Sequence, residues 1–404
     1  MMLRVVRSGL AQLVLAVLLG SLLGVWKPTL AIEMKVFSDL FIAVVRLITP
    51  VVMFVLIASS VAGLRGYGTT LRLSLSTLGY WQLMSLLSLI CGLSVALLLQ
   101  PGVDMPMAEQ SRPHATVIVN SISVTQVPGL LAIAFEHSII FKVLLAALVA
   151  GLLLGLAGDK GSQLRHALKD SVGLVFRTMQ FVIRFAPLAA FGAIAFTISA
   201  YGAGATIPLV KFVATAYAAS LLYILSMLTI ALRVSGISLW KLLGYIKEEL
   251  FLVASTGSSV AALPRLIDKL EAAGCNSKLA RLTLTTGYSF NLNGSNIYLM
   301  VAVIFLAQSA HIELNGQLLL TVLLVSLLTS LSATSVAGSA FITLTATLSV
   351  LQIVPLESIG VLIGVERMMK CRSLTNVLGN CVACLTIASW HKEIDRDKLA
   401  QVLG

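Results

Sequence analysis

Long apolar stretches with almost no charge constrain this chain more than any other feature of its sequence. They recur at residues 10–26, 73–103, 143–157, 187–210, 212–232, 282–310 and 318–356, and a further stretch at 37–62 contains only Asp39 and Arg46 as charges. Most reach the ~20 residues that a helix needs to cross hydrocarbon. Only 11% of residues are charged, against roughly 25% in soluble domains. We therefore predict an all-α polytopic membrane protein.

Lys and Arg are concentrated in every second connection between the apolar stretches. The net charge of +11 would also suit a nucleic-acid-binding protein, but cytoplasmic loops of membrane proteins are enriched in Lys and Arg. Alternate connections are rich in basic residues: Arg4 and Arg7; Arg65 and Arg72; Lys160, Arg165 and Lys169; Arg233, Lys241 and Lys247; Lys392, Arg396 and Lys398. The intervening connections, 101–119, 201–207 and 311–317, are poor in them. This pattern predicts a multi-pass protein of the bacterial inner membrane with both termini cytoplasmic and no nucleic-acid partner.

The first apolar stretch is interpreted as a retained helix rather than a cleaved signal peptide.

Beyond about residue 240, the apolar segments are interrupted at their centres. Residues 250–266 (LFLVASTGSSVAALPRL) and 327–341 (LLTSLSATSVAGSAF) each contain a Ser/Thr/Gly cluster, and each is followed by a span that carries amides. Broken segments at corresponding positions of two halves are typical of inverted-repeat transporters with a site near the midplane. Irregular backbone at that depth must be buried in protein or line a cavity. The pattern predicts two re-entrant hairpins.

Arg372, Asn376 and Asn380 are spaced i, i+4 and i+8, so they share one face of a helix. An arginine at the centre of a membrane helix costs about 3 kcal/mol and normally meets an anion. Its planar fork can hold a carboxylate at two points. The sequence therefore favours a substrate carboxylate as the partner of Arg372, and the alternative is a structural pair with Glu366 or Asp39.

Hydroxyls and amides in the interrupted segments are further candidates. Ser258 and Ser259 can donate hydrogen bonds to a second carboxylate, although hydroxyl clusters in membrane helices also serve packing. Asn291, Asn293 and Asn380 supply neutral oxygens of the kind that hard cations bind, and the alternative is amide cross-linking between helices.

No enzyme chemistry is predicted. An active site needs a nucleophile with a base, paired carboxylates or a set of metal ligands, and none of these stands at membrane depth. Cys381 and Cys384 form a C-x-x-C motif, which we interpret as small buried apolar residues rather than a redox pair or metal site. We expect no cofactor and no bound metal beyond co-transported ions.

The order of four motifs resembles that of a known family. STGSSVAALPRLIDKLEAAGC, TTGYSFNLNGSNIYL, SATSVAGSAF and CRSLTNVLGN follow one another as in the dicarboxylate/amino acid:cation symporters, the glutamate-transporter-like carriers, and resemble above all the bacterial C4-dicarboxylate carriers. The resemblance extends over the whole chain. It implies eight transmembrane helices with two re-entrant hairpins in a homotrimer, and an elevator-type movement. It divides the chain into mostly scaffold and trimerisation helices (1–240), a transport core (241–392) and a cytoplasmic tail (393–404).

The resemblance also implies roles for individual residues. Arg372 would grip the distal carboxylate of the substrate, with Asn376 beside it. The remaining substrate-binding candidates are Ser258, Ser259, Ser295, Val336 and Ser373, and the cation-binding candidates are Ser85, Gly287, Asn291, Asn293 and Asn380.

Met369 distinguishes this chain from the amino-acid carriers, which place an aspartate three residues before the arginine to hold the substrate ammonium. A thioether cannot pair with an ammonium ion, and burying an unpaired charge costs several kcal/mol. The substitution favours a dicarboxylate such as succinate, fumarate or malate. The alternative is an amino acid whose ammonium pairs with Glu366 after a local helix bulge.

The segment from Gly364 to Arg372 is one residue shorter than the family pattern, which places Glu366 about 120° off the face of Arg372 on a continuous helix.

The coupling ion is left open between H⁺ and Na⁺. Importing a dianion against 100 mV costs about 4.6 kcal/mol, so at least two cations are needed to offset it. With Asn293 and Asn380 neutral, we expect fewer or weaker sodium sites than in amino-acid carriers, and Glu366 and Asp39 are the candidate proton carriers.

Residues Ser332, Ser335 and Ala340 replace glycines of the second hairpin and should stiffen it. This replacement motivates a third hypothesis, a transport-incompetent dicarboxylate sensor.

Overall fold

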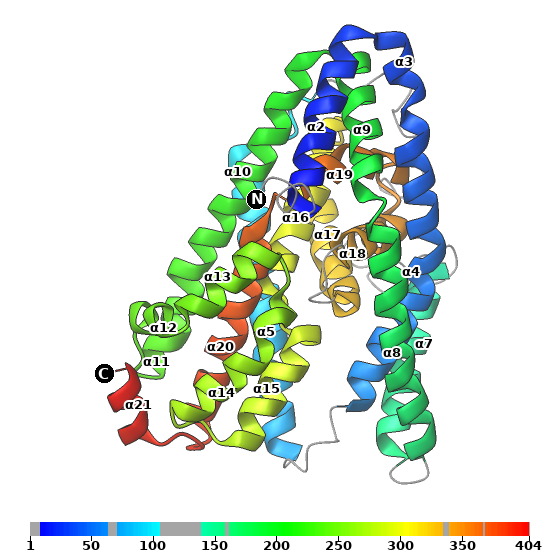
Figure 1. Ribbon diagram of the computed structural model, residues 1–404. Coiled ribbons are helices and arrows are strands. Elements are labelled where there is room, and N and C mark those ends of the chain that lie inside the picture. Colours follow the sequence, from blue (N-terminus) through cyan, green and yellow to red (C-terminus); the bar gives the residue numbers. More distant parts are fainter. Residues whose placement is uncertain are drawn as a thin grey trace.

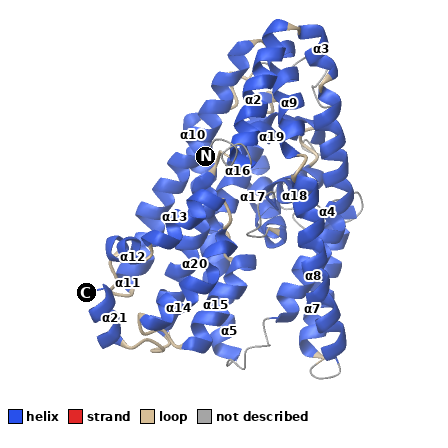
Figure 2. Cartoon of the chain, viewed as in Figure 1, coloured by secondary structure: helices blue, strands red, loops and turns tan. Residues whose placement is uncertain are grey.

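The computed structural model describes residues 9–63, 71–105, 139–157, 161–333, 339–366 and 368–403. Within these ranges the regular structure is helical, and the one extended pairing is an isolated bridge between Cys275 and Ile394 (Figure 2). Helices satisfy all their interior backbone groups internally, which is why apolar sequences of this length adopt them in lipid. The predicted all-α class is confirmed.

One group of helices comes from the first half of the chain. It contains α2 (Gly9–Trp26), α3 (Pro28–Glu33), α4 (Lys35–Gly63), α7 (Ile139–Leu156), α8 (Ser162–Ile183) and α9 (Ala186–Tyr201). α9 packs along α2 and α4, while α7 and α8 pack on α4 (Figure 1). Prolines stand in the first turns of α3 and α9, where their missing N–H breaks no helical hydrogen bond.

A second group surrounds one fully buried helix. Its members are α5 (Leu71–Leu99), α10 (Thr206–Tyr223), a π-helical turn (Ile224–Leu228), α11 (Thr229–Val234), α15 (Ser277–Phe290), α16 (Asn293–Ser309) and α20 (Lys370–Trp390). All 17 residues of α16 are buried, against α5, α20, α10 and α18. Polar residues at its N-terminus are therefore held in the interior of the protein.

The first interrupted segment folds back on itself as hairpin 1 (residues 247–272), which follows α12 (Leu239–Tyr245). Its arms are α13 (Lys247–Thr256) and α14 (Leu263–Ala272), joined by a 3₁₀ turn (Ser259–Ala262). At its base, the Tyr245 hydroxyl donates to the Lys269 carbonyl at 2.9 Å, and Lys269 Nζ donates to Glu249 at 2.7 Å. The chain reverses at Gly257, whose φ of +70° ends α13 in a left-handed conformation.

The second interrupted segment also forms two packed arms, named here hairpin 2 (residues 316–351). These are α17 (Gly316–Thr329) and α18 (Ser339–Leu351), with a 3₁₀ turn at Ser330–Ser332. The hydroxyls of Thr329 and Thr347 lie 2.6 Å apart and join the arms. Ser335 and Val336 lie outside the described residues. A 3₁₀ turn (Leu356–Ile359) and α19 (Gly360–Glu366) then lead to α20.

Several helices are long and apolar enough to cross a membrane. The described residues contain five such spans: Pro28–Ser59, Ser76–Leu99, Thr206–Val234, Ser277–Ser309 and Lys370–Trp390. A sixth arises if Ser162–Ile183 and Ala186–Tyr201, bent by 42°, form one span. Shorter apolar helices are Val14–Trp26, Phe141–Leu156, Gly316–Thr329 and Ser339–Leu351. These lengths fit a polytopic membrane protein.

The connections gather at two opposite ends of the molecule (Figure 1). At one end, Ser76 bonds His391 at 2.7 Å, Arg396 donates to the Ser235 carbonyl at 2.8 Å, and the Asn276 N–H donates to the Glu393 carbonyl at 3.0 Å. At the other end, the Gly102 N–H donates to Gln308 at 3.0 Å and Ser199 donates to the Pro28 carbonyl at 2.8 Å. The first end carries α21 (Arg396–Leu403) and the basic connections at 233–247 and 392–398.

Candidate functional site

The candidate site is built where two helical segments are broken next to each other. The span Ser277–Ser309 is interrupted at Asn291 and Leu292, whose ψ angles of 62° and 59° are not helical. The chain between α19 and α20 is interrupted as well, and Met369 has φ −82° and ψ 67°. Each break frees peptide groups that a continuous helix would have satisfied.

Asn376 joins the two broken segments. Its Oδ1 accepts the N–H groups of Gly294 at 2.8 Å and Ser295 at 3.2 Å, and its Nδ2 donates to Ser295 Oγ at 3.0 Å. These contacts satisfy the first amides of α16, as an N-cap side chain would. Asn376 and Ser295, both predicted substrate contacts, are therefore brought together, with Asn376 also capping α16.

Arg372 lies one turn before Asn376 on α20, and its side chain is 9% exposed. Its Nη2 lies 3.0 Å from Glu366 Oε1, and the Glu366 side chain is 2% exposed. This contact lacks hydrogen-bond geometry, and Arg372 Nε has no hydrogen-bond partner within the described ranges. The guanidinium carbon also stands 5.9 Å from the centre of the Tyr298 ring. The arginine is thus charge-compensated on one side while part of its donor fork is unused.

The expectation that Glu366 lies about 120° off the face of Arg372 is wrong. That angle assumes one continuous helix, but α19 ends at Glu366 and α20 begins at Lys370. The break at Met369 turns the chain so that the two side chains meet. The structure therefore contains the ion pair with Glu366 that the sequence left as an alternative, whereas Asp39 forms no ion pair in the described part of the chain.

The tip of hairpin 1 is attached to the start of α20. Ser373 Oγ donates to the Gly257 carbonyl at 3.0 Å, and Ser259 Oγ donates to the Ser373 carbonyl at 3.2 Å. Ser258, between them, is half-buried and extended, with φ −124° and ψ 118°. The hydroxyls of Ser255 and Thr256 instead donate back to the Leu252 carbonyl. Hairpin 1 thus brings Ser258 and Ser259 beside the residue that follows Arg372.

Three buried asparagines gather at the break between α15 and α16. Asn291 Nδ2 donates to Asn380 Oδ1 at 3.0 Å, and Asn291, Asn293 and Asn380 are all 0% exposed. Asn291 Oδ1, both polar atoms of the Asn293 side chain and Asn380 Nδ2 have no hydrogen-bond partner among the described residues. Buried polar groups are almost always hydrogen-bonded, so unpaired oxygens here are available to an ion or water.

The side chain of Asn380 packs directly against Gly287. The carboxamide of Asn380 lies so close to Gly287 that a Cβ there would overlap its Oδ1. The Gly287 carbonyl accepts the N–H of Asn291 at 2.8 Å, which ends α15. Ser85 reaches the same region from α5, because its hydroxyl lies 3.5 Å from the Phe290 carbonyl. All five cation-binding candidates therefore lie close together around the break between α15 and α16.

Val336 and Asp39 are the two remaining candidates. Val336 falls outside the described residues. Asp39 lies on α4 and is half-buried, and its Oδ1 has no hydrogen-bond partner within the described ranges.

Two residues of the site were missed by sequence reasoning. Tyr298 faces Arg372, and its hydroxyl has no hydrogen-bond partner among the described residues. Thr375 is 0% exposed with an unpaired hydroxyl of the same kind. Both stand three residues after a predicted site residue, Ser295 and Arg372 respectively. That helical spacing could have indicated them.

The cysteines of the C-x-x-C motif are free thiols. Cys381 and Cys384 are both 0% exposed and pack in the apolar core. This agrees with their interpretation as small buried apolar residues.

Comparison with known proteins identifies the chain's relatives. Residues 10–390 match the sodium:dicarboxylate symporter family. The chain is 38% identical to proteins named C4-dicarboxylate transport protein from Burkholderia ambifaria (strain MC40-6) and Burkholderia pseudomallei (strain K96243). In both cases 404 residues are compared, which cover 97% of this chain and 94% of the relative. It is a multi-pass membrane transporter rather than an enzyme, and it belongs to the sodium:dicarboxylate symporter family.

Proposed function

We propose that this protein is a secondary active symporter that imports C4-dicarboxylates, such as succinate, fumarate or malate, together with H⁺ or Na⁺. The observation that carries the proposal is the buried guanidinium of Arg372, whose Nε–H has no hydrogen-bond partner among the described residues and whose neighbour Ser373 bonds the tip of hairpin 1. A desolvated arginine fork with unused donors suits a carboxylate. The printed names of the relatives support the same substrate class.

A C4-dicarboxylate has two carboxylates, and we assign donors to each. The hydroxyls of Ser259 and Ser373 would exchange their backbone carbonyl partners for the substrate. Arg372, with Asn376 and Ser373 beside it, would bind one carboxylate. Ser258 and Ser259 at the tip of hairpin 1 would receive the other, together with Ser295 and Val336 as further contacts. The short distance between Ser373 and the tip, 3.0 Å to the Gly257 carbonyl, supports a small substrate.

The substrate preference follows from Met369. It is the residue before α20, is 3% exposed and presents a thioether where an ammonium would need a carboxylate. A specific observation keeps the amino-acid alternative as second candidate. Glu366 lies 3.0 Å from Arg372 and could pair with an ammonium. Malate and aspartate differ at this group, so their competition against succinate separates the two functions.

Cations would bind at the asparagine cluster. The unpaired Asn291 Oδ1 and Asn293 Oδ1, with the carbonyls freed at the break, offer neutral oxygens to a hard cation. The two negative charges of the substrate cost about 4.6 kcal/mol per 100 mV of inside-negative potential, so two or more cations must enter with it.

Glu366 is the first candidate for the residue that carries a co-transported proton. While charged, it occupies one side of the Arg372 guanidinium. Protonation would remove that competition and leave the arginine for the substrate carboxylate. Asp39 is the second candidate carrier, because it is half-buried in an apolar span.

For the architecture, we propose eight transmembrane helices with hairpins 1 and 2 re-entrant, in an elevator-type homotrimer with both termini cytoplasmic in the inner membrane. The gathering of basic connections at one end of the molecule supports this orientation. We place α5, α10 and α11 with the moving unit, because they pack on α16 and α20. Helices α2, α3, α4, α7, α8 and α9 would supply the scaffold.

Uptake of radiolabelled succinate into proteoliposomes tests the function, with sodium and pH gradients imposed separately. We expect uptake to follow at least one gradient. The Arg372→Ala variant should lose dicarboxylate binding while the protein stays assembled, because its buried guanidinium is the group that we assign to the substrate carboxylate. Cys371→Ser, the adjacent position, should retain uptake. Normal uptake by Arg372→Ala would show that the arginine serves only its pair with Glu366, and the site would be wrong.

A further inference from the structure

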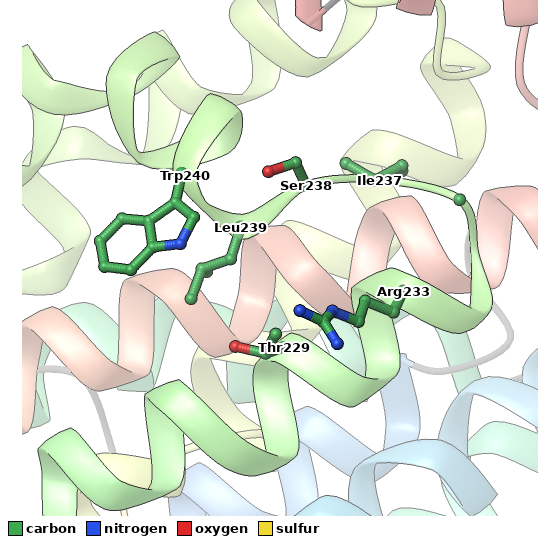
Figure 3. Close-up of a pocket in the computed structure, with 7 residues that line it drawn as sticks. Thr229, Arg233, Ile237, Ser238, Leu239 and Trp240 are labelled. Atoms are coloured by element: carbon green, nitrogen blue, oxygen red, sulfur yellow. The ribbon is translucent and has the colours of Figure 1, made fainter.

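A pocket of about 340 Å³ lies between the end of α11 and the start of α12 and shares no residue with the Arg372 site. Its walls are Thr229, Arg233, Gly236, Ile237, Ser238, Leu239 and Trp240 (Figure 3). This volume falls within the range of small-molecule sites.

The pocket is formed by a sharp reversal of the chain. α11 ends at Val234, and Gly236 has a φ of +75°. The N–H of Gly236 donates to the Arg233 carbonyl at 3.0 Å, and the N–H of Ile237 donates to the Leu232 carbonyl at 2.9 Å. This capping motif satisfies the last carbonyls of the helix and folds residues 237–240 back over α11. From α21, Arg396 holds the turn by donating to the Ser235 carbonyl at 2.8 Å.

The pocket presents the exposed cation of Arg233 beside the hydroxyl of Ser238. Arg233 is exposed and forms no ion pair or side-chain hydrogen bond with the described residues. Thr229 stands one helical turn earlier on the same face, and Ser238 crosses above the arginine (Figure 3). The Ser238 side chain does not cap α12. The Thr229 hydroxyl donates to the Ile224 carbonyl at 3.1 Å, so the donors that face a phosphate here are the Arg233 guanidinium and the Ser238 hydroxyl.

The surroundings place this pocket at the edge of a bilayer. The apolar span Thr206–Val234 ends directly at it. Along that span Leu221, Leu225, Ile230 and Val234 are exposed, by 57%, 46%, 56% and 71%. Trp240, on the pocket wall, is 71% exposed. Tryptophan and arginine at the end of an apolar span are typical of the headgroup region, with the apolar surface beside acyl chains.

We propose that this pocket binds the phosphate headgroup of an anionic phospholipid at the basic end of the molecule. Arg233 and Ser238 donate to the phosphate, with Thr229 on the pocket wall beside them. Trp240 covers the glycerol region, and the acyl chains lie along the exposed face of α10 and α11. A freely dissolved phosphate would use the same donors but would gain nothing from the exposed apolar surface, which is why a lipid is the favoured occupant.

Native mass spectrometry of the full-length protein tests this proposal, with phosphatidylglycerol and phosphatidylcholine titrated separately. We expect wild type to retain phosphatidylglycerol preferentially. Arg233→Gln should reduce that retention roughly fivefold, the effect of one basic side chain at an anionic surface, and Arg233→Lys should restore most of it. The control is Lys278→Gln, because Lys278 is an exposed lysine of the same end outside the pocket, and it should match wild type.

Two results would overturn the proposal. Equal retention by Arg233→Gln and Lys278→Gln, with both variants unfolding at the wild-type temperature, would show that Arg233 does not hold the lipid. Displacement of phosphatidylglycerol by inorganic phosphate as readily as by fresh lipid would assign the pocket to a dissolved anion. Persistence of the lipid under phosphate, in wild type only, supports it. None of these measurements depends on the transported substrate.

Discussion

At the scale of single residues, the pair between Arg372 and Glu366 determines how the site can work. Removing one partner of a buried ion pair costs about 3–5 kcal/mol, because the other charge is left uncompensated. A substrate carboxylate that binds Arg372 must therefore share the guanidinium with Glu366 or replace it. The misaligned 3.0 Å contact between them leaves donors for sharing.

Glu366→Gln tests whether this carboxylate competes with the substrate. We expect the glutamine variant to bind succinate more tightly than wild type, because a neutral side chain no longer competes with the substrate carboxylate for Arg372. Isothermal titration calorimetry of both proteins in the same buffer measures the difference. Equal or weaker binding by the variant would show that Glu366 does not compete with the substrate.

Met369→Asp tests the basis of substrate choice. A carboxylate at this buried position gives an ammonium a partner, so aspartate should compete with labelled succinate in the variant and not in wild type. Met368→Asp is the matched control, since Met368 is only half-buried and lies one residue further from α20. Competition that is equal in the two variants would contradict the role given to Met369.

At the scale of elements, hairpin 1 depends on a backbone conformation at its tip that favours glycine. Gly257 has a φ of +70°, and a Cβ there would lie 2.6 Å from Lys370 Nζ at the start of α20. Its carbonyl accepts the hydroxyl of Ser373. The conformation of one residue therefore determines both the turn and its docking on α20.

Gly257→Ala should accordingly destabilise the protein by about 1–2 kcal/mol, from left-handed strain and contact with Lys370. Gly244→Ala, in α12 with open space around it, should be neutral or stabilise by up to about 1 kcal/mol. Thermal unfolding of both variants in the same detergent gives the comparison. Equal unfolding temperatures would argue against a strained tip.

At the scale of the whole molecule, the two ends of the helical bundle differ in charge, and this difference predicts orientation. Lys278 lies at the basic end, near Asn276 and Glu393, while Glu313 lies in the opposite connection after α16. A membrane-impermeant thiol reagent should label Glu313→Cys in spheroplasts. It should label Lys278→Cys only after the membrane is opened. Four of the native cysteines are buried and Cys91 is half-buried, so background labelling should be low. The reverse pattern would invert the proposed topology.

The sequence by itself determined the helical class, the position of the spans and the shared face of Arg372, Asn376 and Asn380. These depend on hydrophobicity and on the helical period, both of which are local. The pairing of Glu366 with Arg372, the capping of α16 by Asn376 and the docking of Ser373 on hairpin 1 were decided only by the tertiary structure. Each depends on backbone angles at a break, at Met369, Asn291 or Gly257. At such a position a few tens of degrees redirect the following helix, and side-chain spacing no longer predicts which groups meet.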